Sequence, residues 1–574
     1  MFISYLDRLG DWNPQLFREV KGRLNFRNLG IAGAIAILGQ ILLLLTFSGQ
    51  LPTDLDALND PPFQYSRYCT ATPPTGSYAP YKQLYCIQDL FGNWVINWQL
   101  WWLDIFNTLS VVGLFILLTT GIFLLIADLS REENRGTFNF IRLSPRSANN
   151  ILLGKILGVP CVIYFLCLLL FPLHLIAGFQ AHISPSLILA YYGGIIASCA
   201  FFYSLALLFG SVSSGLGGFQ SFLGSGVILF FLFMMTSITF SSSELVSHTP
   251  LDWIILFYPG NLLSYLVEST YLPPDTANLQ YESFYNLAWY GQQLWENPIL
   301  GIGFILGNYS LWTYWINQSL DRRFRNPNAT WFSKLNSYYL SASFIIVVSG
   351  FVFQSGRNGN FERHIFENFA VLQIFIVFFA CFLMVALSPN RQTLHDWARY
   401  RHQNQPNRRS LLQELILGEK SPSTLAIAFN LGIMFLYLIP GIIMAPINNS
   451  LGVFVGLFLS MNVILIYAVI GQRILLLKIP KQTLVAGAVV GILMFFPPIC
   501  FSILGGLPHQ SFTPWLFTFF SIAFLNNHLK SLQIMSVLFS LLSQWGIIGL
   551  AGFEMSKRLK KVGESETKVL LKSV

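Results

Sequence analysis

The sequence predicts an all-α, polytopic helical membrane protein of about 12 transmembrane helices, arranged as two parallel six-span repeats. The chain of 574 residues is 54% hydrophobic and only 10% charged, whereas soluble domains carry about 25% charged residues. Its apolar residues form continuous runs, each near the roughly 20 residues that a helix needs to cross a bilayer. Backbone polar groups in lipid must bond within their own segment, so such runs predict helices.

The apolar runs place the spans one after another along the chain. They are expected at about 29–49, 98–127, 153–178, 187–210, 219–240, 298–317, 339–355, 369–388, 423–444, 452–472, 483–504 and 532–552. Residues 1–28 are mixed and charged and lack the pattern of a cleavable signal peptide, so the first run is expected to remain as a span.

The loops between these spans are sorted by charge. Alternating sides puts 29 of the 34 Lys and Arg on the side of the N-terminus, while the 26 acidic residues divide 13 and 13. One side therefore carries +16 and the other −8. Loops rich in cations stay in the cytoplasm, which predicts a multi-pass protein of the plasma (inner) membrane with both termini cytoplasmic. The basic excess also predicts contact with lipid headgroups and does not imply nucleic-acid binding.

Two segments outside the spans have readable patterns. Residues 13–27 place apolar side chains largely on one face and arginines and a lysine on the rest, after the helix start Asn13-Pro14. This pattern predicts an amphipathic helix in the membrane interface, the alternative being an ordinary basic flank.

The extracytoplasmic loop 50–97 contains Cys69 and Cys86. An oxidising compartment there would favour a disulfide between them, the alternative being two free thiols.

The two halves of the chain repeat one plan. Residues 29–317 form the first six-span unit and 339–552 a diverged second unit, joined by a cytoplasmic linker, 318–338, and followed by a basic tail, 553–574. In each half two spans precede a charged loop, 129–155 or 389–421, that ends in Ser-Pro before the next span. Each half also has a broken apolar segment before its last span, at 241–297 and 505–530. Parallel repeats are one known plan of transporters.

Catalytic motifs are missing from the sequence. Gly154-Lys155 lacks the glycine pattern and the Ser/Thr of a phosphate-binding loop, and no histidine has a second ligand at metal spacing. Asp104 is the only clear ionisable residue within a span, near its outer end. The sequence thus indicates a protein that is not an enzyme and holds no catalytic residues, metal or cofactor of its own.

Loop 129–155 carries the most specific motif. It is the last charged segment before a stretch without Asp, Glu, Lys or Arg that runs from residue 156 to 243. Its motif residues are Glu133, Arg135, Gly136, Thr137, Leu143, Ser144, Pro145, Gly154 and Lys155. This pattern resembles the signature of type-2 ATP-binding-cassette (ABC) exporter permeases. The resemblance covers the first six spans; loop 389–421 lacks Arg-Gly-Thr and keeps only an acidic residue, an apolar turn and Ser-Pro.

The resemblance implies a permease subunit of an ABC exporter, which forms the substrate pathway and couples to separate ATPase subunits, two in number, that bind the ATP. Loop 129–155 would be the coupling helix, with Phe138, Phe140 and Ile141 as apolar anchors for docking, and loop 389–421 would dock more weakly. The alternative is an ion-gradient-driven secondary transporter or channel without an ATPase partner. The sequence does not identify the substrate.

Overall fold

The chain is an all-α, multi-pass membrane protein. The computed structural model describes residues 10–52, 65–70, 84–213, 217–241, 246–268, 286–354, 361–404, 408–445, 450–479, 482–503, 512–521 and 531–563. Within these ranges, 11 helices are long and apolar enough to cross a membrane. The described strands are a single antiparallel pair of two residues each, β1 (Tyr65–Ser66) and β2 (Leu84–Tyr85).

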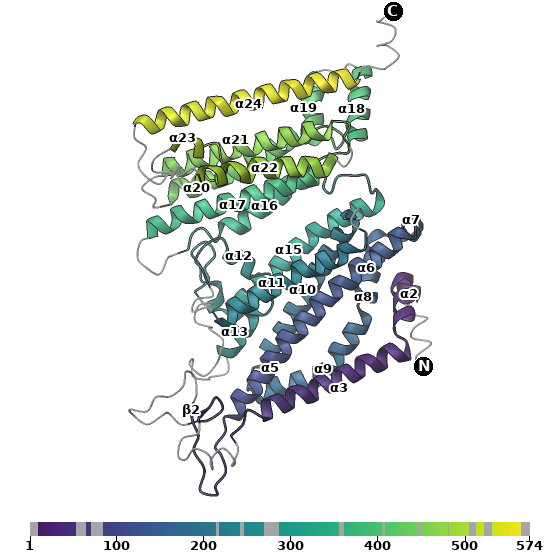
Figure 1. Cartoon of the computed structure of the whole chain (residues 1–574), viewed down its shortest axis with the longest axis vertical. Helices are drawn as coiled ribbons and strands as arrows, with labels where there is room; N and C mark the ends of the chain where they lie inside the picture. Colours follow the sequence, from purple (N-terminus) through teal and green to yellow (C-terminus); the bar gives the residue numbers. More distant parts are fainter. Residues whose placement is uncertain are drawn as a thin grey trace, which may run out of the picture. The chain divides into compact units, whose positions relative to one another are not determined.

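The residues divide into two compact units. Unit 1 comprises Met1–Ser247, Ile254–Leu287 and Gln293–Arg325, and unit 2 comprises His248–Trp253, Ala288–Gln292 and Asn326–Val574. The boundary at Arg325 lies inside the expected linker, because the last helix of unit 1 continues beyond residue 317. Figure 1 shows the helices of both units.

Unit 1 contains the first set of long helices and the helices of loop 129–155. Its elements are α2 (Pro14–Arg23), α3 (Phe26–Ser48), α5 (Trp98–Phe115), η1 (Ile116–Thr120), α6 (Gly121–Asn134), α7 (Thr137–Arg142), α8 (Ala148–Gly158), α9 (Cys161–Gln180), α10 (Pro185–Val212), α11 (Phe219–Ser241), α13 (Asn261–Glu268), η4 (Leu294–Glu296) and α15 (Pro298–Arg325). The short α12 (Asp252–Ile255) lies where the chain passes from unit 2 back to unit 1.

Unit 2 repeats this order with α16 (Lys334–Ser349), α17 (Phe361–Leu387), α18 (Arg391–Asn404), α19 (Arg408–Leu417), α20 (Thr424–Met444), α21 (Ser450–Leu475), α22 (Gln482–Ile503), α23 (Phe512–Trp515) and α24 (Ser531–Gly563). The packing also repeats. In unit 1, α3 packs on α9, and α10 packs on α6 and α15. In unit 2, the corresponding α16 packs on α20, and α21 packs on α17 and α24.

The seventh expected span differs from its prediction. The apolar run predicts a span at 339–355, but α16 begins at Lys334, ends at Ser349 and has 16 residues. At 1.5 Å per residue it is about 24 Å long, somewhat less than a hydrocarbon core of about 30 Å. The helix begins early because Ser333 caps it, with its side chain accepting a hydrogen bond from the Asn336 amide. Apolarity alone does not reveal such a cap.

The broken segment 241–297 contributes to both units. Unit 1 receives α13 and η4 from it, while unit 2 receives two short stretches that its own polar side chains hold. The Gln354 amide nitrogen donates to Asp252 Oδ2 (3.1 Å), and the Asn368 amide nitrogen donates to the His248 carbonyl (3.0 Å). Short helices and turns therefore form here, as the polar and Pro/Gly breaks predict. Residues 269–285 and most of the second broken segment, 505–530, lie outside the described residues.

One long helix crosses unit 1 from end to end. α5, η1 and α6 form a continuous 37-residue helix, Trp98–Asn134, and η1 is a π-helical turn in its middle. A π turn displaces backbone carbonyls from their usual partners. The Tyr203 hydroxyl of α10 donates to the Leu117 carbonyl there (2.7 Å). Gly121 permits this approach, since a Cβ at that position would lie 2.3 Å from the Tyr203 oxygen.

The described parts of loop 50–97 lie at the α5 end of this helix, and α7 follows its other end (Figure 1). A disulfide joins Cys69 and Cys86, whose Cα atoms are 4.8 Å apart. Both cysteines are buried. The bond therefore ties the described parts of the loop, 65–70 and 84–97, to each other next to the start of α5.

The orientation in the membrane gives the first testable prediction. Reporter fusions after Val574 and within residues 55–90 should lie on opposite sides, with the Val574 fusion in the cytoplasm, because 29 of the 34 cations fall on the side of the N-terminus. Alkaline phosphatase is active only outside the cytoplasm and green fluorescent protein fluoresces only inside it, so paired fusions measure both. The same location for the two sites would contradict this topology.

Candidate functional site

Loop 129–155 folds into a short helix between two longer ones. α6 ends at Asn134, α7 follows at Thr137 and α8 begins at Ala148. The turn between α6 and α7 is made by Gly136, whose φ is +70°. L-residues with a side chain rarely adopt this conformation. A Cβ at Gly136 would meet no atom within 4 Å, so the glycine is needed for its backbone conformation, not for a close approach.

Most of the predicted motif residues lie at the surface of this loop. Arg135, Gly136, Thr137 and Pro145 are exposed, while Glu133 and Ser144 are half-buried. The Thr137 hydroxyl donates to the Glu132 carbonyl (3.1 Å) and so fixes the start of α7 to the end of α6. Residues 133–145 of the motif thus form one structured, largely solvent-facing turn and helix, while Gly154 and Lys155 are buried in α8. The predicted Cys69 and Cys86 lie apart from it, in loop 50–97.

The apolar tip of the loop differs in part from the prediction. Phe140 is 80% exposed and Leu143 is 84% exposed, so both offer apolar surface. Ile141, expected as an anchor, is buried within the unit, because it lies on the opposite face of α7. The side chain of Phe138 lies outside the described residues. Phe140 and Leu143 are therefore the described side chains that could bury apolar area against a partner.

The base of the loop rests on α2. Asn13 caps α2 by accepting from the Leu16 amide (3.0 Å), and its own amide donates to the Asn150 carbonyl of α8 (2.7 Å). Gly154 allows the two helices to touch, since a Cβ there would lie 2.6 Å from Asn13 Oδ1 and 2.9 Å from the Leu16 amide. A helix, α2, thus forms within the expected segment 13–27, and the face that it packs on α8 is largely polar. Its place in the membrane interface stays a prediction.

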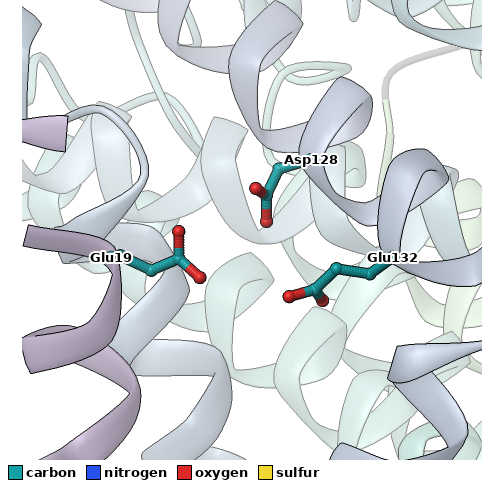
Figure 2. Close-up of side chains that lie close together, drawn as sticks. All are labelled: Glu19, Asp128 and Glu132. Atoms are coloured by element: carbon teal, nitrogen blue, oxygen red, sulfur yellow. The ribbon is translucent and has the colours of Figure 1, made fainter. Parts of the chain in front are cut away.

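A charge cluster joins α2, α6 and α8. Figure 2 shows its three carboxylates, Glu19, Asp128 and Glu132, converging from α2 and α6. Between the latter two lies Lys155 of α8, 1% exposed. Its Nζ is 2.7 Å from Asp128 Oδ2 and 2.6 Å from Glu132 Oε2, although only the contact with Asp128 has the geometry of a hydrogen bond.

Two arginines of α2 complete the charge cluster. Arg18 pairs with Glu19 (2.9 Å) and with Glu132, and Arg23 pairs with Glu19 (3.1 Å) and with Asp128. Burial lowers the pKa of Arg18, but hydrogen bonds and attraction to Glu19 and Glu132 outweigh it, so that this pKa lies above its usual value.

The charge cluster already contains its own counter-ions. Three carboxylates whose oxygens lie within 4.8 Å of one another could hold a divalent metal ion. Here Lys155, Arg18 and Arg23 balance them one for one, and the ammonium of Lys155 occupies the position between Asp128 and Glu132. The arrangement is therefore a set of ion pairs that holds three helices together beneath α7.

A groove separates α2 from α7. It has a volume of 230 Å³ and is lined by residues of α2, α7 and α8 and their flanks, among them Asn13, Gln15, Arg18, Phe140, Ser144 and Arg146. Exposed Phe140 thus lies beside a recess whose other wall is polar and basic. A partner that covers Phe140 would also enter this groove.

The corresponding loop of unit 2 is built differently. Lys334 of α16, 2% exposed, donates to the Leu415 carbonyl (2.7 Å), the Ser421 hydroxyl (2.6 Å) and the Pro422 carbonyl (3.0 Å). These three acceptors are neutral, whereas Lys155 of unit 1 contacts carboxylates. The helices α18 and α19 take the place of the single short helix α7. The Ser-Pro shared by both halves thus receives a lysine only in the second.

Asp104 has a partner that the sequence did not indicate. Arg67 of loop 50–97 forms two hydrogen bonds with its carboxylate, at 2.6 Å and 2.9 Å. The residues are 37 apart in sequence, and no local pattern connects them.

The second missed feature is the charge cluster. Asp128 and Glu132 are four residues apart at the end of a span, which puts both on one helix face. Two carboxylates on one face beside a span indicate a nearby buried cation.

Known proteins give no further guidance to this site. The chain matches no protein-family model, no curated protein and no solved structure. What the site can do therefore rests on its own geometry: a rigidly based loop with a glycine-set turn, an exposed apolar tip and an adjoining groove.

Proposed function

We propose that the chain is the membrane-spanning permease subunit of an ABC exporter, with both termini in the cytoplasm, and that it couples to separate ATPase subunits through loop 129–155. The observation that carries the proposal is α7, which presents Phe140 and Leu143 to solvent while its flanking helices are held by the charge cluster. Neighbouring exposed apolar side chains surrounded by arginines match the composition of a docking surface, where an apolar anchor is ringed by polar groups.

The rigid base supports a role in transmission of force. A partner that moves α7 also moves α6 and α8, because Lys155 links α8 to α6, while Arg18 and Arg23 link α2 to α6. α6 continues through η1 into α5, so the motion reaches the other end of the unit. Such rigid-body movement is a common way to couple ATP hydrolysis to a change of conformation.

The decisive experiment is identification of the ATPase. The chain purified from native membranes should carry stoichiometric amounts of a protein with a phosphate-binding loop, and the reconstituted pair should hydrolyse ATP faster than the ATPase alone. If no such protein binds the intact chain, and transport persists with an ion gradient but without ATP, the alternative of a secondary transporter or channel replaces this proposal.

The coupling loop gives the second prediction. Replacing Phe140→Ala together with Leu143→Ala should weaken ATPase binding about tenfold or more, because truncated interface anchors commonly cost above 1 kcal/mol each. Insertion and folding should be unchanged, since both side chains are exposed. Binding is measured by titration of the purified ATPase onto nanodiscs that contain the variant.

The matched control uses the second loop. Leu412 and Leu417 of α19 are also exposed leucines, and the change Leu412→Ala with Leu417→Ala should weaken binding less. Equal binding by the Phe140/Leu143 variant and loss of binding by the α19 variant would show that the two loops were assigned the wrong way round.

A further inference from the structure

The end of α5 next to loop 50–97 lines a second cavity, far along the chain from the coupling loop. It has a volume of 340 Å³, within the range of small-molecule sites. Its walls come from four places in unit 1: the end of α3, the disulfide-bonded loop, one face of α5 and the end of α11. The lining combines polar residues, among them Arg67, Asp104 and Asn107, with the apolar Phe47, Val111, Val112 and Phe240.

The polar residues of the lining have acceptor positions without a hydrogen-bond donor among the described residues. The carboxylate of Asp104 accepts two hydrogen bonds from Arg67 and one from the Tyr68 hydroxyl (3.2 Å), whereas a carboxylate offers about four acceptor positions. Asn107, one turn further along α5, is 7% exposed, and its Oδ1 has no hydrogen-bond partner among the described residues. A buried acceptor without a donor is costly. Both groups therefore favour a ligand that donates hydrogen bonds.

The net charge of loop 50–97 narrows the chemical class of the ligand further. Arg67 and Asp104 neutralise each other, and loop 50–97 as a whole contains four aspartates against two cations, Arg67 and Lys82. By sequence, this loop carries a net charge of −2, which favours association with cations over anions. A lining that combines apolar side chains with hydrogen-bond acceptors matches a molecule with an apolar tail and a positively charged head.

We propose that this cavity binds a cationic amphiphile with a primary ammonium head. The ammonium has three N–H donors, enough to serve Asn107 Oδ1 and the remaining acceptor position of Asp104. Its alkyl chain lies along Val111, Val112 and Phe240. The Arg67–Asp104 pair positions the carboxylate and remains formed in the complex. Binding requires no ATPase, so this inference stands or falls separately from the proposed function.

Photolabelling tests the inference directly. The intact chain, in nanodiscs of phosphatidylcholine, is labelled with a dodecylamine that carries a diazirine in its chain, and the labelled residues are mapped by mass spectrometry. We expect labels on α5 between residues 104 and 112, and competition by unlabelled dodecylamine but not by dodecyl sulfate. The same labelling from a dodecyl sulfate probe, or no saturable labelling of α5 by the amine, would overturn the proposal.

Two variants and a control separate binding from folding. Asn107→Leu should reduce labelling about tenfold, as expected for loss of a hydrogen bond to a charged group, and Val112→Trp should reduce it by filling the cavity. Thr46→Val removes an exposed hydroxyl of α3 outside the cavity lining and should label as the native chain does. Native-level labelling of Asn107→Leu, with the Cys69–Cys86 bond intact, would also refute the site.

Discussion

Replacing Lys155 by methionine is expected to destabilise unit 1 by about 3–5 kcal/mol, the usual cost of leaving buried charges without their partner. Lys155 is 1% exposed and contacts both Asp128 and Glu132. Without it, three carboxylates face only Arg18 and Arg23. Water cannot replace the ammonium as effectively in this buried position. The contact between α6 and α8 should then open in an appreciable fraction of molecules, and α2, which packs on α8, should lose this support.

Limited trypsinolysis measures this loss of support for α2 locally, because Arg18 and Arg23 are themselves cleavage sites within α2. Cleavage there should accelerate by about a hundredfold or more if docking is weakened by 3 kcal/mol. A second change, Asp128→Asn, should restore much of the loss, since two carboxylates would again face two arginines. Unchanged cleavage of the Lys155→Met variant would show that the charge cluster does not hold α2.

The matched control is Lys21→Met, which removes an exposed cation from the same helix. Surface charges contribute at most about 1 kcal/mol, so thermal unfolding and the rate of cleavage after Arg18 and Arg23 should change little, while the tryptic site at residue 21 itself is lost. A large effect of Lys21→Met would point to headgroup attraction, and not to the charge cluster, as the force that holds α2 in place.

The second large effect is expected at Gly154. A Cβ at this position would lie 2.6 Å from Asn13 Oδ1, 2.9 Å from Gln15 Cβ and 2.9 Å from the Leu16 amide. The last atom belongs to the backbone and cannot rotate away. Gly154→Val should therefore force α2 off α8 and cost about 3 kcal/mol, the upper end of typical overpacking penalties. The Asn13–Asn150 hydrogen bonds should be lost with it.

Gly22 of α2 provides the control. Nothing lies within 4 Å of a Cβ built there, so Gly22→Ala should be neutral or stabilise the helix by up to about 1 kcal/mol. Both variants are compared by the same cleavage assay and by ATPase binding. Gly154→Val with native cleavage and native binding would mean that the α2–α8 contact is looser than its geometry indicates.

The spans and the loop could be predicted from the sequence because both rest on local patterns. Hydropathy reports apolar runs directly, and the Asn13-Pro14 pair marks the start of α2, whose cap the structure contains. The turn at Gly136 is likewise a local property. The limits of α16 were not predictable from apolarity, because a serine cap and buried Lys334 extend the helix beyond the apolar run.

The charge cluster and the cavity were not predicted because they depend on pairing over long distances in the chain. Glu19 lies more than a hundred residues from Asp128, and Arg67 lies 37 residues from Asp104. Composition shows only that cations and anions are present. The burial of Ile141 and the exposure of Leu143 depend on how α7 is rotated about its axis relative to the rest of the unit. A helix of six residues is too short for its sequence pattern to determine this rotation.

The continuous helix α5–η1–α6 has a consequence of its own. A π turn accommodates one extra residue, which rotates everything beyond it by about 100° relative to an unbroken α-helix. η1 thus sets the rotation about the helix axis between Asp104, near one end, and Asp128, near the other. If the turn relaxed to α-helical winding, Asp128 would swing away from Lys155 while Asp104 stayed with Arg67. The hydrogen bond from the Tyr203 hydroxyl to the Leu117 carbonyl lies within η1 and contributes to the stability of the π turn.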